Sequence, residues 1–560
     1  MTAVSPTPAW GEAERARALD AAASGEPLDV LVVGGGITGA AVLRDAASRG
    51  LRAFLVERGD FACGTSSRSS KMIHGGLRYL AEGQFRVTAE ACRERDLLVR
   101  QHPNLVRSTP FLFPSFSGGK VPPWQVRAAM WVYAAMGRFR RSARFRMLDA
   151  REAHRFSPDL RREGFRTAAV YHDGQVDDAR LVLELVRSAR ALGAEAANHA
   201  EVTALLHADG RVAGARVRDL LRGCDRTLRA RAVVNAAGPG LERVRGLDGV
   251  PAHPELRPAK GVHLVIRGDR VRSEGAVTFE AEDGRHLFLA PWDDLSLIGT
   301  TDDFTDEVDE PVVTIEEVHY LLAAANAAFP GVALTTNDIV SVYAGVRPLV
   351  APPEATVPPS SVSREHQIYE DPSGLISAAG GKLTTHRSMA RGLVDRALRY
   401  LPEDRRRAAG PSRTDGLPLR DDDFDGEALA SSLVARFDVG WIQARHLVRQ
   451  YGREAEPLLA EAPSEQRCSI GSSRYSWAEI PWALRTECAT SLSDLLEHRV
   501  RMAIFAVGQG IPELPDIAQL AARTVGWDEE RTRAETAAYR ATVMRRYQIA
   551  RPRAARASAA

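Results

Sequence analysis

Cysteine is scarce in this chain of 560 residues, and the cysteines form no metal-binding or redox pattern. There are five, an odd number, with no C-x-x-C pair. This excludes a cysteine zinc site and favours a reducing compartment in which disulfides do not form. The first residues also lack the composition of a secretory or transit peptide. We therefore expect a cytoplasmic protein.

Long apolar runs are absent as well, because no stretch approaches the roughly eighteen residues of a membrane-spanning helix. Any membrane contact is therefore expected to be peripheral. Neither sign of charge dominates: 74 Lys and Arg stand against 72 Asp and Glu, a balance that gives no indication of nucleic-acid binding. What remains is a composition typical of a large globular protein, with room for about three or four domain equivalents.

Residues 29–58, DVLVVGGGITGAAVLRDAASRGLRAFLVER, carry the clearest pattern in the sequence. They open with a short Val-rich run, as expected of a buried parallel strand. Gly34, Gly36 and Gly39 follow at G-x-G-x-x-G spacing, then small helix-forming residues, then a second apolar run that ends at Glu57. Two strands, a glycine turn, a helix and an acid in this register indicate a dinucleotide-binding unit.

Each of these residue types has a physical role. Gly34 permits a tight turn, Gly36 lets a pyrophosphate approach the backbone, and Gly39 lets the helix pack closely on the strand. The helix N-terminus offers free N–H groups to the phosphates. Glu57 can accept hydrogen bonds from the adenosine ribose hydroxyls. A glycine triplet alone is also typical of an ordinary tight turn, but the surrounding pattern favours the dinucleotide site.

Residues 63–79, CGTSSRSSKMIHGGLRY, form the most unusual stretch of the chain. Serine and threonine crowd its first half, and the pair Gly75-Gly76 follows. The hydroxyls and backbone N–H groups could line a pyrophosphate and ribityl chain, and the two glycines could lie flat against a ring system. Arg78 is placed just beyond, where it could hold an anionic substrate. The alternative is an ordinary surface loop of small polar residues.

These two stretches together closely resemble the flavin-dependent glycerol-3-phosphate dehydrogenases, FAD enzymes that oxidise sn-glycerol 3-phosphate to dihydroxyacetone phosphate. Further matches keep the family's order over roughly residues 27–510. They are residues 176–181 (VDDARL), 233–239 (VVNAAGP), 260–263 (KGVH), 298–302 (IGTTD), 345–349 (GVRPL) and 380–385 (GGKLTT). One departure is His386-Arg387, where the family commonly has Tyr-Arg. We expect this difference to affect the detailed properties of the site more than the reaction itself.

The residue types of two of these matches favour a cofactor site even without the resemblance. Residues 232–235 form a predicted buried strand, and 236–238 (AAG) carry no large side chain that could obstruct a cofactor at its end. Residues 374–379 form another strand, and 380–400 a predicted helix whose N-terminus would stabilise negative charge on a flavin ring. Lys382 would add to this effect or hold substrate phosphate. An ordinary tight turn and a solvated lysine are the alternatives.

The resemblance implies an α/β fold, in which a Rossmann-like FAD-binding domain is interleaved with an antiparallel-sheet substrate domain and followed by an all-α C-terminal domain. Residues 255–350 support the sheet, because apolar and polar residues alternate there between Gly-Asp, Asp-Gly and Asp-Asp turns. The expected parts are a loose leader (1–26), the interleaved domains (27–405), a helical domain (411–548) and a basic tail (549–560). Within 27–405, the FAD-binding domain takes about 27–108, 148–254 and 365–405, and the substrate domain about 109–147 and 255–364.

The resemblance also implies FAD as the cofactor and places one set of residues around it. These residues are Gly34, Gly36, Ile37, Thr38, Gly39, Glu57, Thr65, Ser66, Ser69, Ser70, Lys71, His74, Gly75, Gly76, Leu77, Val202, Ala236, Ala237, Gly238, Gly380, Gly381, Lys382, Leu383 and Thr384. No metal is expected.

The implied substrate carries a phosphate dianion and a secondary alcohol, so it needs several cations and a group that takes the hydroxyl proton. The matching substrate-side residues are Arg78, Tyr79, His263, Thr300, Thr301, Arg347, Arg364 and Lys382. Of these, His263, Arg347 and Lys382 are the expected catalytic residues, and the C2 hydride would pass to the flavin. His263 is the preferred base because an unperturbed imidazole titrates near neutrality. Two alternatives stay open: His74, or water aided by Arg347.

Residues 121–146, VPPWQVRAAMWVYAAMGRFRRSARFR, mix aromatic and basic side chains. Trp124, Trp131 and Tyr133 lie near Arg127, and a run of arginines follows. This mixture is typical of a segment at an anionic membrane surface, and a half-buried helix with a solvated basic end is the alternative. The resemblance favours the membrane, because these dehydrogenases are peripheral membrane enzymes that pass electrons to quinone.

The resemblance therefore implies a quinone-dependent dehydrogenase at the cytoplasmic face of the inner or plasma membrane. Three other functions stay open: an oxidase that uses dioxygen, an amine-oxidising relative, and a flavin-fold protein that binds a ligand without turnover. The C-terminal helices show no catalytic constellation, so a structural role or a homodimer contact is expected of them.

Overall fold

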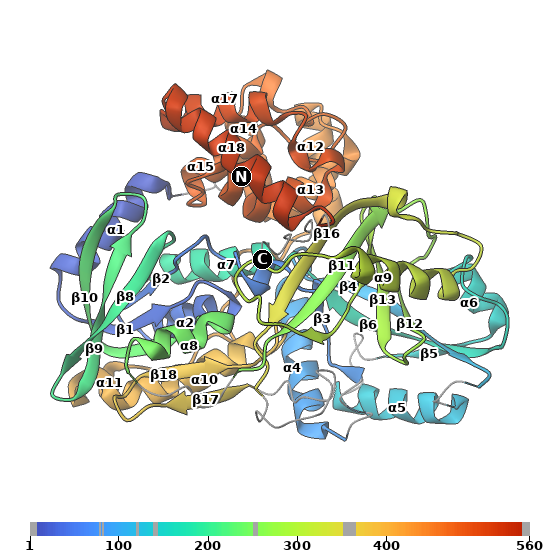
Figure 1. Ribbon diagram of the computed structural model, residues 1–560, viewed down its shortest axis with the longest axis horizontal. Coiled ribbons are helices and arrows are strands. Elements are labelled where there is room, and N and C mark those ends of the chain that lie inside the picture. Colours follow the sequence, from blue (N-terminus) through green and yellow to red (C-terminus); the bar gives the residue numbers. More distant parts are fainter. Residues whose placement is uncertain are drawn as a thin grey trace, which may run out of the picture.

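The computed structural model describes residues 8–77, 80, 83–118, 122–137, 144–249, 256–350 and 366–550. Two β-sheet domains lie side by side, and a helical domain sits above their junction in the view of Figure 1. This confirms the predicted α/β fold with an all-α C-terminal domain. Arg78, Tyr79 and Arg364, predicted on the substrate side, lie outside the described residues, as does most of the basic tail.

The first sheet has a parallel centre. Its strands are β1 (Leu28–Val33), β2 (Ala53–Val56), β7 (Glu195–Ala197), β8 (Ala200–Ala208), β9 (Arg211–Asp219), β10 (Cys224–Asn235), β17 (Gln367–Glu370) and β18 (Ile376–Ala379). β1 pairs in parallel with β2 and β10, and β10 pairs in parallel with β18. β1 is buried along its whole length, which explains why its sequence is continuously apolar rather than alternating.

Both faces of these parallel strands are covered, as this type of sheet requires. On one face, α2 (Ile37–Ser48), α7 (Asp178–Ala191) and α10 (His386–Ala397) form a buried cluster with alternate residues of β1. On the other face, α1 (Glu12–Ser24) and the antiparallel strands β8 to β10 form a second cluster. Two short helices, α8 (Leu241–Gly246) and α11 (Glu403–Ala408), complete this domain.

The expectation of a loose leader over 1–26 is wrong for residues 12–24, which form α1. Before this helix, Trp10 is only 1% exposed and stacks on Phe61, with ring centroids 5.5 Å apart. Within it, the buried Arg15 donates to Asp219 at 3.0 Å. A segment rich in Ala, Glu and Arg has high helix propensity, and these two anchors attach the helix to the sheet.

Among the described residues, the second sheet has ten strands: β3 (Met72–Ile73), β4 (Arg107–Phe116), β5 (Arg146–Leu148), β6 (Phe165–Gln175), β11 (Ala259–Arg267), β12 (Ala276–Glu280), β13 (His286–Trp292), β14 (Leu295–Gly299), β15 (Asp303–Phe304) and β16 (Ile339–Arg347). All pairs are antiparallel except β4 with β12. β6 pairs with β4 along its length, so residues 165–175, expected in the FAD-binding domain, belong to this sheet.

The second sheet is also covered on two sides. On one side lie α6 (Ala150–Phe156) and α9 (Ile315–Ala328). On the other side, α5 (Pro123–Met136) and the C-terminal helices share one buried cluster with the strands. The longer C-terminal helices are α12 (Gly426–Phe437), α13 (Trp441–Tyr451), α14 (Ala455–Glu461), α15 (Glu479–Thr486), α17 (Leu514–Val525) and α18 (Glu529–Arg546).

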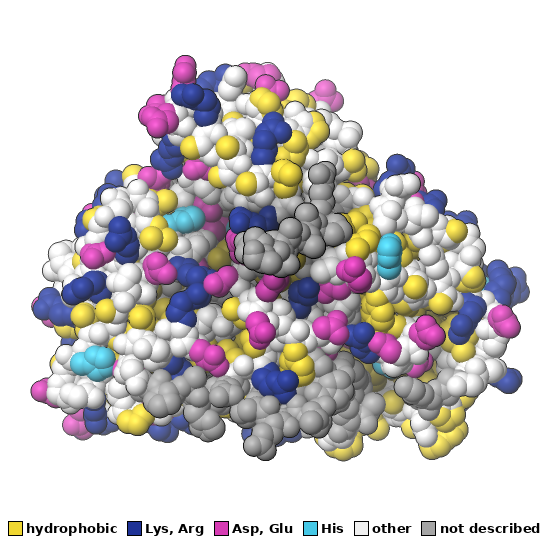
Figure 2. All heavy atoms as spheres, in the orientation of Figure 1, with side chains coloured by type: hydrophobic (Ala, Val, Ile, Leu, Met, Phe, Trp, Pro, Cys, Tyr) yellow, Lys and Arg dark blue, Asp and Glu magenta, His cyan; other side chains and the backbone are white. Residues whose placement is uncertain are grey.

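The helices and the surface charge of the described residues agree with the composition of the sequence. Among its helices, none is long and apolar enough to cross a bilayer. Figure 2 shows basic and acidic side chains interspersed over one face of the molecule, in agreement with the near-neutral composition.

Candidate active site

The glycine turn after β1 is so tight that two of its glycines admit no side chain. A Cβ on Gly39 would lie 1.8 Å from the carbonyl oxygen of Gly34. Gly34 has a left-handed φ of 111°, and a Cβ on it would lie 2.6 Å from the carbonyl oxygen of Ala236. The turn, the start of α2 and the end of β10 therefore meet at one edge of the first sheet, where this fold binds dinucleotides.

The N-terminus of α2 binds a polar side chain of the serine-rich loop. Gly36 caps the helix, and the Ile37 N–H donates to Ser66 Oγ at 2.9 Å. Behind the turn, the Glu57 carboxylate accepts from the Gly35 N–H at 2.6 Å. A hydroxyl bonded at a helix N-terminus marks a position that suits a pyrophosphate, and Glu57 is held at the end of β2, where the ribose of a dinucleotide lies in this fold.

One buried carboxylate, that of Asp178 at the start of α7, holds the serine-rich loop. Its Oδ2 accepts from the Ser69 N–H and Oγ at 3.0 and 2.7 Å, and its Oδ1 accepts from Lys71 Nζ at 2.7 Å. The polar groups of Ser69 and Lys71, both predicted at the cofactor, thus point to Asp178. Burial lowers the pKa of Lys71 to about 8, against the attraction of Asp178.

His263 on β11 faces this loop. Its Nε2 lies 2.8 Å from Ser70 Oγ, and its ring stacks on Tyr343 of β16 with centroids 4.8 Å apart. Its buried Nδ1 has no hydrogen-bond partner among the described residues. Burial and the positive charges of Arg347 and Lys71 hold the pKa of His263 well below 6.5. The imidazole is therefore neutral near pH 7, with a lone pair that can take a proton.

Arg347, at the end of β16, lies beside the IGTTD turn. Its guanidinium donates to Asp302 at 2.8 Å and to Thr300 Oγ1 at 3.2 Å, and one fifth of the side chain is exposed. Gly261 leaves the necessary space, since a Cβ there would lie 2.4 Å from the guanidinium. The hydroxyl of Thr301 instead accepts from a backbone N–H of β11 at 3.0 Å. Arg347 is thus aligned by Asp302 and still accessible to an anion.

The backbone at Gly75 rests on a buried polar cluster that was not predicted. The Gly75 N–H donates to Tyr133 Oη at 2.9 Å, and Tyr133 donates to Asp173 at 2.9 Å. Arg95 completes the cluster with a 2.7 Å bond to Asp173. A Cβ on Gly75 would lie 2.4 Å from Tyr133 Oη, so only glycine brings the backbone this close.

The interpretation of Tyr133 as part of a membrane surface is therefore wrong. Tyr133 is 1% exposed, whereas Trp124 and Trp131 on the same helix are 68% and 57% exposed. Helical geometry explains the difference: residues seven apart share a face, and residue 133 is two positions, about 200°, from residue 131. The helical period was the signal that could have identified it from the sequence.

The GGKLTT segment reaches the same region but does not begin a helix as predicted. Gly380 and Gly381 have left-handed φ values of 71° and 98°, which interrupt helical geometry, and α10 begins only at His386. Thr384 Oγ1 accepts from the His74 N–H at 3.1 Å and donates to the His74 carbonyl at 3.3 Å. These bonds join the segment to the serine-rich loop next to Gly75 and Gly76.

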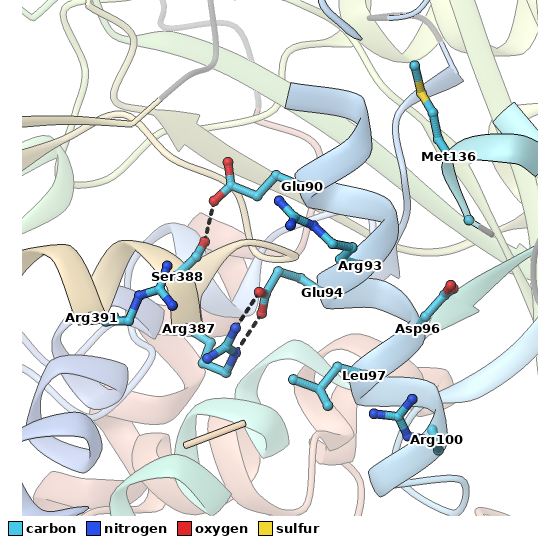
Figure 3. Close-up of a pocket in the computed structure, with 11 residues that line it drawn as sticks. Glu90, Arg93, Glu94, Asp96, Leu97, Arg100, Met136, Arg387, Ser388 and Arg391 are labelled. Carbon is cyan, nitrogen blue, oxygen red and sulfur yellow. Dashed lines mark hydrogen bonds and ion pairs between the residues drawn. The ribbon is translucent and has the colours of Figure 1, made fainter. Parts of the chain in front are cut away.

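A cavity of about 250 Å³ lies between α4 (Phe85–Gln101) and α10 (Figure 3). Its lining mixes both signs of charge: Glu90, Glu94, Asp96, Arg93, Arg100, Arg387 and Arg391. Arg387 is already engaged by both oxygens of Glu94, at 2.8 and 2.6 Å. Because no single sign of charge dominates, the cavity is poorly suited to a phosphate dianion, and His263 and Arg347 define the better candidate site.

The structure brings together pairs of predicted residues that are distant in sequence. They are Ser70 with His263, Thr300 with Arg347, His74 with Thr384, and Gly34 with Ala236. Thr65 donates to the carbonyl of Val346. The other predicted cofactor residues of these segments are Thr38, Gly76, Leu77, Ala237, Gly238, Lys382 and Leu383. Val202 lies apart on β8, opposite Val217.

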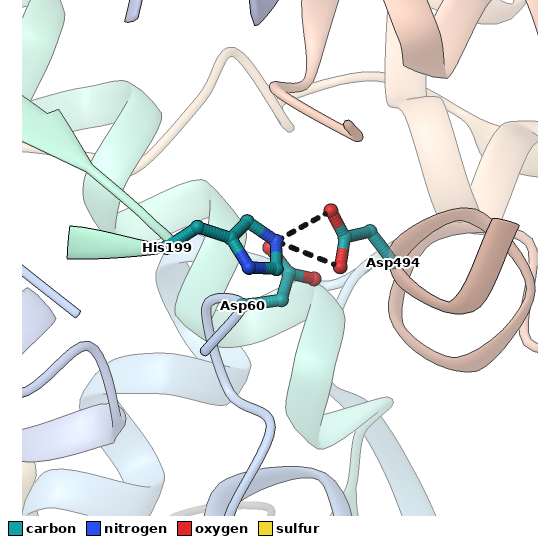
Figure 4. Close-up of side chains that lie close together, drawn as sticks. All are labelled: Asp60, His199 and Asp494. Carbon is teal, nitrogen blue, oxygen red and sulfur yellow. Dashed lines mark hydrogen bonds and ion pairs between the residues drawn. The ribbon is translucent and has the colours of Figure 1, made fainter. Parts of the chain in front are cut away.

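Asp60, His199 and Asp494 come close enough together to suggest a metal site (Figure 4). Their oxygens, however, already accept from protein groups. The Asp60 carboxylate takes two bonds from Arg499, at 2.7 and 2.9 Å, and one from His498 at 2.9 Å. His199 Nε2 lies 3.0 Å from Asp494. A cation would have to displace a guanidinium, so the arrangement is that of an ion-pair network between domains.

This network predicts a pH-dependent stability. Burial alone disfavours charge on His199, but Asp494 outweighs it and raises the pKa of His199 to about 9. A raised pKa contributes stability that is complete below pH 6.5 and is lost as the pH rises through 9, by about 3 kcal/mol. The melting temperature is therefore expected to fall between pH 7 and 9.5, and less steeply in His199→Gln. The control is His319→Gln, because His319 is exposed. A chelator should not change the melting temperature of the wild type or of His199→Gln. If the melting temperature of His199→Gln depended on pH as steeply as that of the wild type, the assignment would be contradicted.

The comparisons with known proteins agree with this geometry. Residues 29–396 match the family model described as FAD dependent oxidoreductase, and residues 412–532 match that described as the C-terminal domain of alpha-glycerophosphate oxidase. The mitochondrial glycerol-3-phosphate dehydrogenase of Mus musculus is 34% identical over 529 residues, 90% of this chain and 72% of that protein. The aerobic glycerol-3-phosphate dehydrogenase of Staphylococcus aureus (strain USA300) is 35% identical over 481 residues, 84% of this chain and 86% of that protein.

Solved structures give the same picture. The glycerol-3-phosphate dehydrogenase from Bacillus halodurans complexed with FAD matches with a TM-score of 0.78 and 28% identity, over 96% of this chain and 98% of that chain. The L-alpha-glycerophosphate oxidase from Mycoplasma pneumoniae shares the fold, with a TM-score of 0.53 and 18% identity over 67% of this chain and 95% of that chain.

The glycine cradle, the N-terminus of α2 and the fixed Glu57 define a dinucleotide-binding site, and the family model over residues 29–396 makes the protein an FAD-dependent oxidoreductase. The chain belongs to the flavin-dependent glycerol-3-phosphate dehydrogenase family. FAD is its cofactor, as predicted, and the residues present fit it. Gly34 and Gly39 make the tight turn possible, Gly36 leaves the space that the pyrophosphate needs, and the buried Nδ1 of His263 offers an unused polar atom.

Proposed function

We propose that the chain oxidises sn-glycerol 3-phosphate to dihydroxyacetone phosphate. The observation that carries the proposal is the pairing of a neutral imidazole, His263, with a partly exposed arginine, Arg347, on adjacent strands β11 and β16. The relatives named as glycerol-3-phosphate dehydrogenases support this choice of substrate.

The side chains would divide the work as follows. Arg347 and Lys382 hold the phosphate dianion by charge-assisted hydrogen bonds, with Arg78 and Arg364 as further proposed contacts. His263 takes the hydroxyl proton at Nδ1, while Ser70 fixes the ring through Nε2 at 2.8 Å. FAD, when bound, accepts the hydride that leaves C2.

Substrate binding itself would prepare the base. The positive charge of Arg347 is one of the causes that lower the pKa of His263. A phosphate dianion beside Arg347 offsets that charge and so raises the proton affinity of the imidazole. The proton is therefore taken more readily when the substrate is in place.

The first test is anaerobic. The purified yellow protein is mixed with sn-glycerol 3-phosphate, and the absorbance of the flavin is followed. Prompt bleaching is expected; bleaching by amino acids alone would overturn the substrate. A quinone analogue and dioxygen, added separately afterwards, show which acceptor restores the colour.

We propose that a quinone is this acceptor and that the protein is bound at the cytoplasmic face of the membrane. One face of α5 supports this, because Trp124, Trp131 and Val132 are 68%, 57% and 40% exposed. Exposed apolar atoms reach the lower edge of Figure 2, where Figure 1 places this helix. Exposed Arg144 and Arg146 follow it, so an apolar face and a basic segment lie close together in the chain.

The membrane proposal predicts binding to vesicles that contain an anionic lipid such as phosphatidylglycerol. Replacing Trp124 and Trp131 by serine is expected to weaken sedimentation with these vesicles about tenfold or more, because two large apolar side chains no longer enter the lipid. Trp441→Ser on α13, 44% exposed, is the matched control. Equal binding by all three proteins would refute a role of α5.

A further inference from the structure

Arg501 of the C-terminal domain reaches the serine-rich loop beside the candidate active site. Arg501 is 2% exposed and has a left-handed φ of 68°, a conformation that costs a non-glycine residue energy and persists only where the surroundings hold it. Its guanidinium donates to Asp177 at 3.2 Å, to Asp178 at 3.1 Å and to the Ser67 carbonyl at 3.1 Å. All three acceptors belong to the FAD-binding domain.

The acceptors of Arg501 are connected to the proposed base, His263, through the serine-rich loop. Asp178 is the carboxylate that also binds Ser69 and Lys71, and Ser67 lies two residues before Ser69. The residue between Ser69 and Lys71 is Ser70, whose Oγ lies 2.8 Å from His263 Nε2. The backbone on both sides of Ser70 is thus fixed by a cluster that Arg501 completes.

The charges of this cluster balance. Asp177 and Asp178 carry two negative charges, and Lys71 and Arg501 carry two positive charges. Asp178, Lys71 and Arg501 are buried, and the side chain of Asp177 is 14% exposed. Lys71 alone would leave one carboxylate charge uncompensated, which a buried site does not tolerate well. Arg501 therefore supplies the second positive charge that compensates the two carboxylates.

We propose that Arg501 is a positioning residue for the oxidation: it holds the segment 67–71 so that Ser70 orients His263 toward the substrate hydroxyl. The C-terminal domain, expected to have only a structural role, then takes part in assembling the active site. The inference rests on the proposed function for the role of His263, but the placement of the loop can be tested without any substrate.

Two variants separate the side chain from its backbone conformation. Arg501→Gly removes the guanidinium and tolerates the left-handed φ, whereas Arg501→Lys keeps the charge but cannot reach three acceptors at once. Arg187→Ala is the matched control, because Arg187 on the same helix as Asp178 also binds the C-terminal domain, through Glu454 at 2.6 and 2.7 Å, without contacting the loop.

The substrate-free measurement is hydrogen exchange of the holoenzyme, followed by mass spectrometry of peptides that cover residues 63–73. Faster exchange of these peptides is expected in Arg501→Gly, a smaller effect in Arg501→Lys, and wild-type exchange in Arg187→Ala. Unchanged exchange in Arg501→Gly would overturn the proposal. If Arg501→Gly does not fold, Arg501→Lys alone decides by the same criterion.

The kinetic measurement uses FAD-saturated enzyme and sn-glycerol 3-phosphate. Arg501→Gly is expected to lower kcat about 10- to 100-fold with little change in KM, since the cations that hold the substrate stay in place. Ser70→Ala combined with Arg501→Gly should be hardly slower than Ser70→Ala alone, because both changes act through the same contact. Additive effects would overturn the proposal. If the wild type does not turn over the substrate, the proposed function fails, whereas the exchange result still decides the role of Arg501.

Discussion

Alanine in place of Gly39 is expected to leave a colourless protein that retains no FAD. The new Cβ would lie 1.8 Å from the carbonyl oxygen of Gly34. No rotamer change can relieve this clash, because the backbone of residue 39 fixes the position of the Cβ and the oxygen is itself a backbone atom. Opening the turn separates α2 from β1 and removes the phosphate cradle, at a cost of about 3 kcal/mol or more. Absorbance of the bound flavin, measured after gel filtration, checks the result.

Two further variants separate loss of cofactor from loss of fold. A Cβ on Gly36 would meet only Ser66 Oγ, at 3.1 Å, so Gly36→Ala should fold with a wild-type circular dichroism spectrum and bind FAD about 10- to 100-fold more weakly. A Cβ on Gly246 would meet no atom within 4 Å, so Gly246→Ala should bind FAD like the wild type. Full FAD occupancy in Gly39→Ala would contradict the assignment of the site.

Replacing His263 by alanine is expected to lower the rate of anaerobic flavin reduction about 10²- to 10⁴-fold, the range typical of a lost general base. The reason is that Nδ1 is the unpartnered nitrogen of a ring already held by Ser70 and stacked on Tyr343. His319→Ala, an exposed histidine on α9, should leave the rate unchanged. A wild-type rate in His263→Ala would transfer the role of base to His74 or to water.

The dependence of kcat/KM on pH tests the same assignment of His263 as the base. The pKa of free His263 lies well below 6.5 because of burial and the charges of Arg347 and Lys71, so the base stays unprotonated into mildly acidic solution. The acid limb of kcat/KM is therefore expected below pH 6.5, after correction for the second ionisation of the substrate phosphate near 6. That limb should be absent in His263→Ala.

Local patterns predicted much of the fold. The run before Gly34, the glycine spacing and the acid at Glu57 identified β1, α2 and β2, because strand burial and turn geometry act over a few residues. The alternation over 255–350 predicted the antiparallel strands for the same reason. The start of α10 was missed, because the left-handed φ of Gly380 and Gly381 is not visible in their helix-like context.

Most of the candidate site depended on contacts that no local pattern contains. Ser70 and His263 are 193 residues apart, and Arg501 and Ser67 are 434 residues apart. Asp178 lies within the matching motif of residues 176–181, and Arg501 lies in the C-terminal domain, where the sequence predicted no site residue. Tyr133 was placed on the wrong side of its helix, because aromatic and basic composition was considered without the helical period.

The sequence by itself determined a β-α-β dinucleotide-binding unit, since spacing and residue type along one segment suffice for that. The family and its FAD followed from the resemblance of motifs that are spread over most of the chain. The tertiary structure alone decided which nitrogen of His263 is unused, why its pKa is low, and how the C-terminal domain holds the loop beside it. These properties arise from burial and from charges brought together across domains, and neither is defined until the chain has folded.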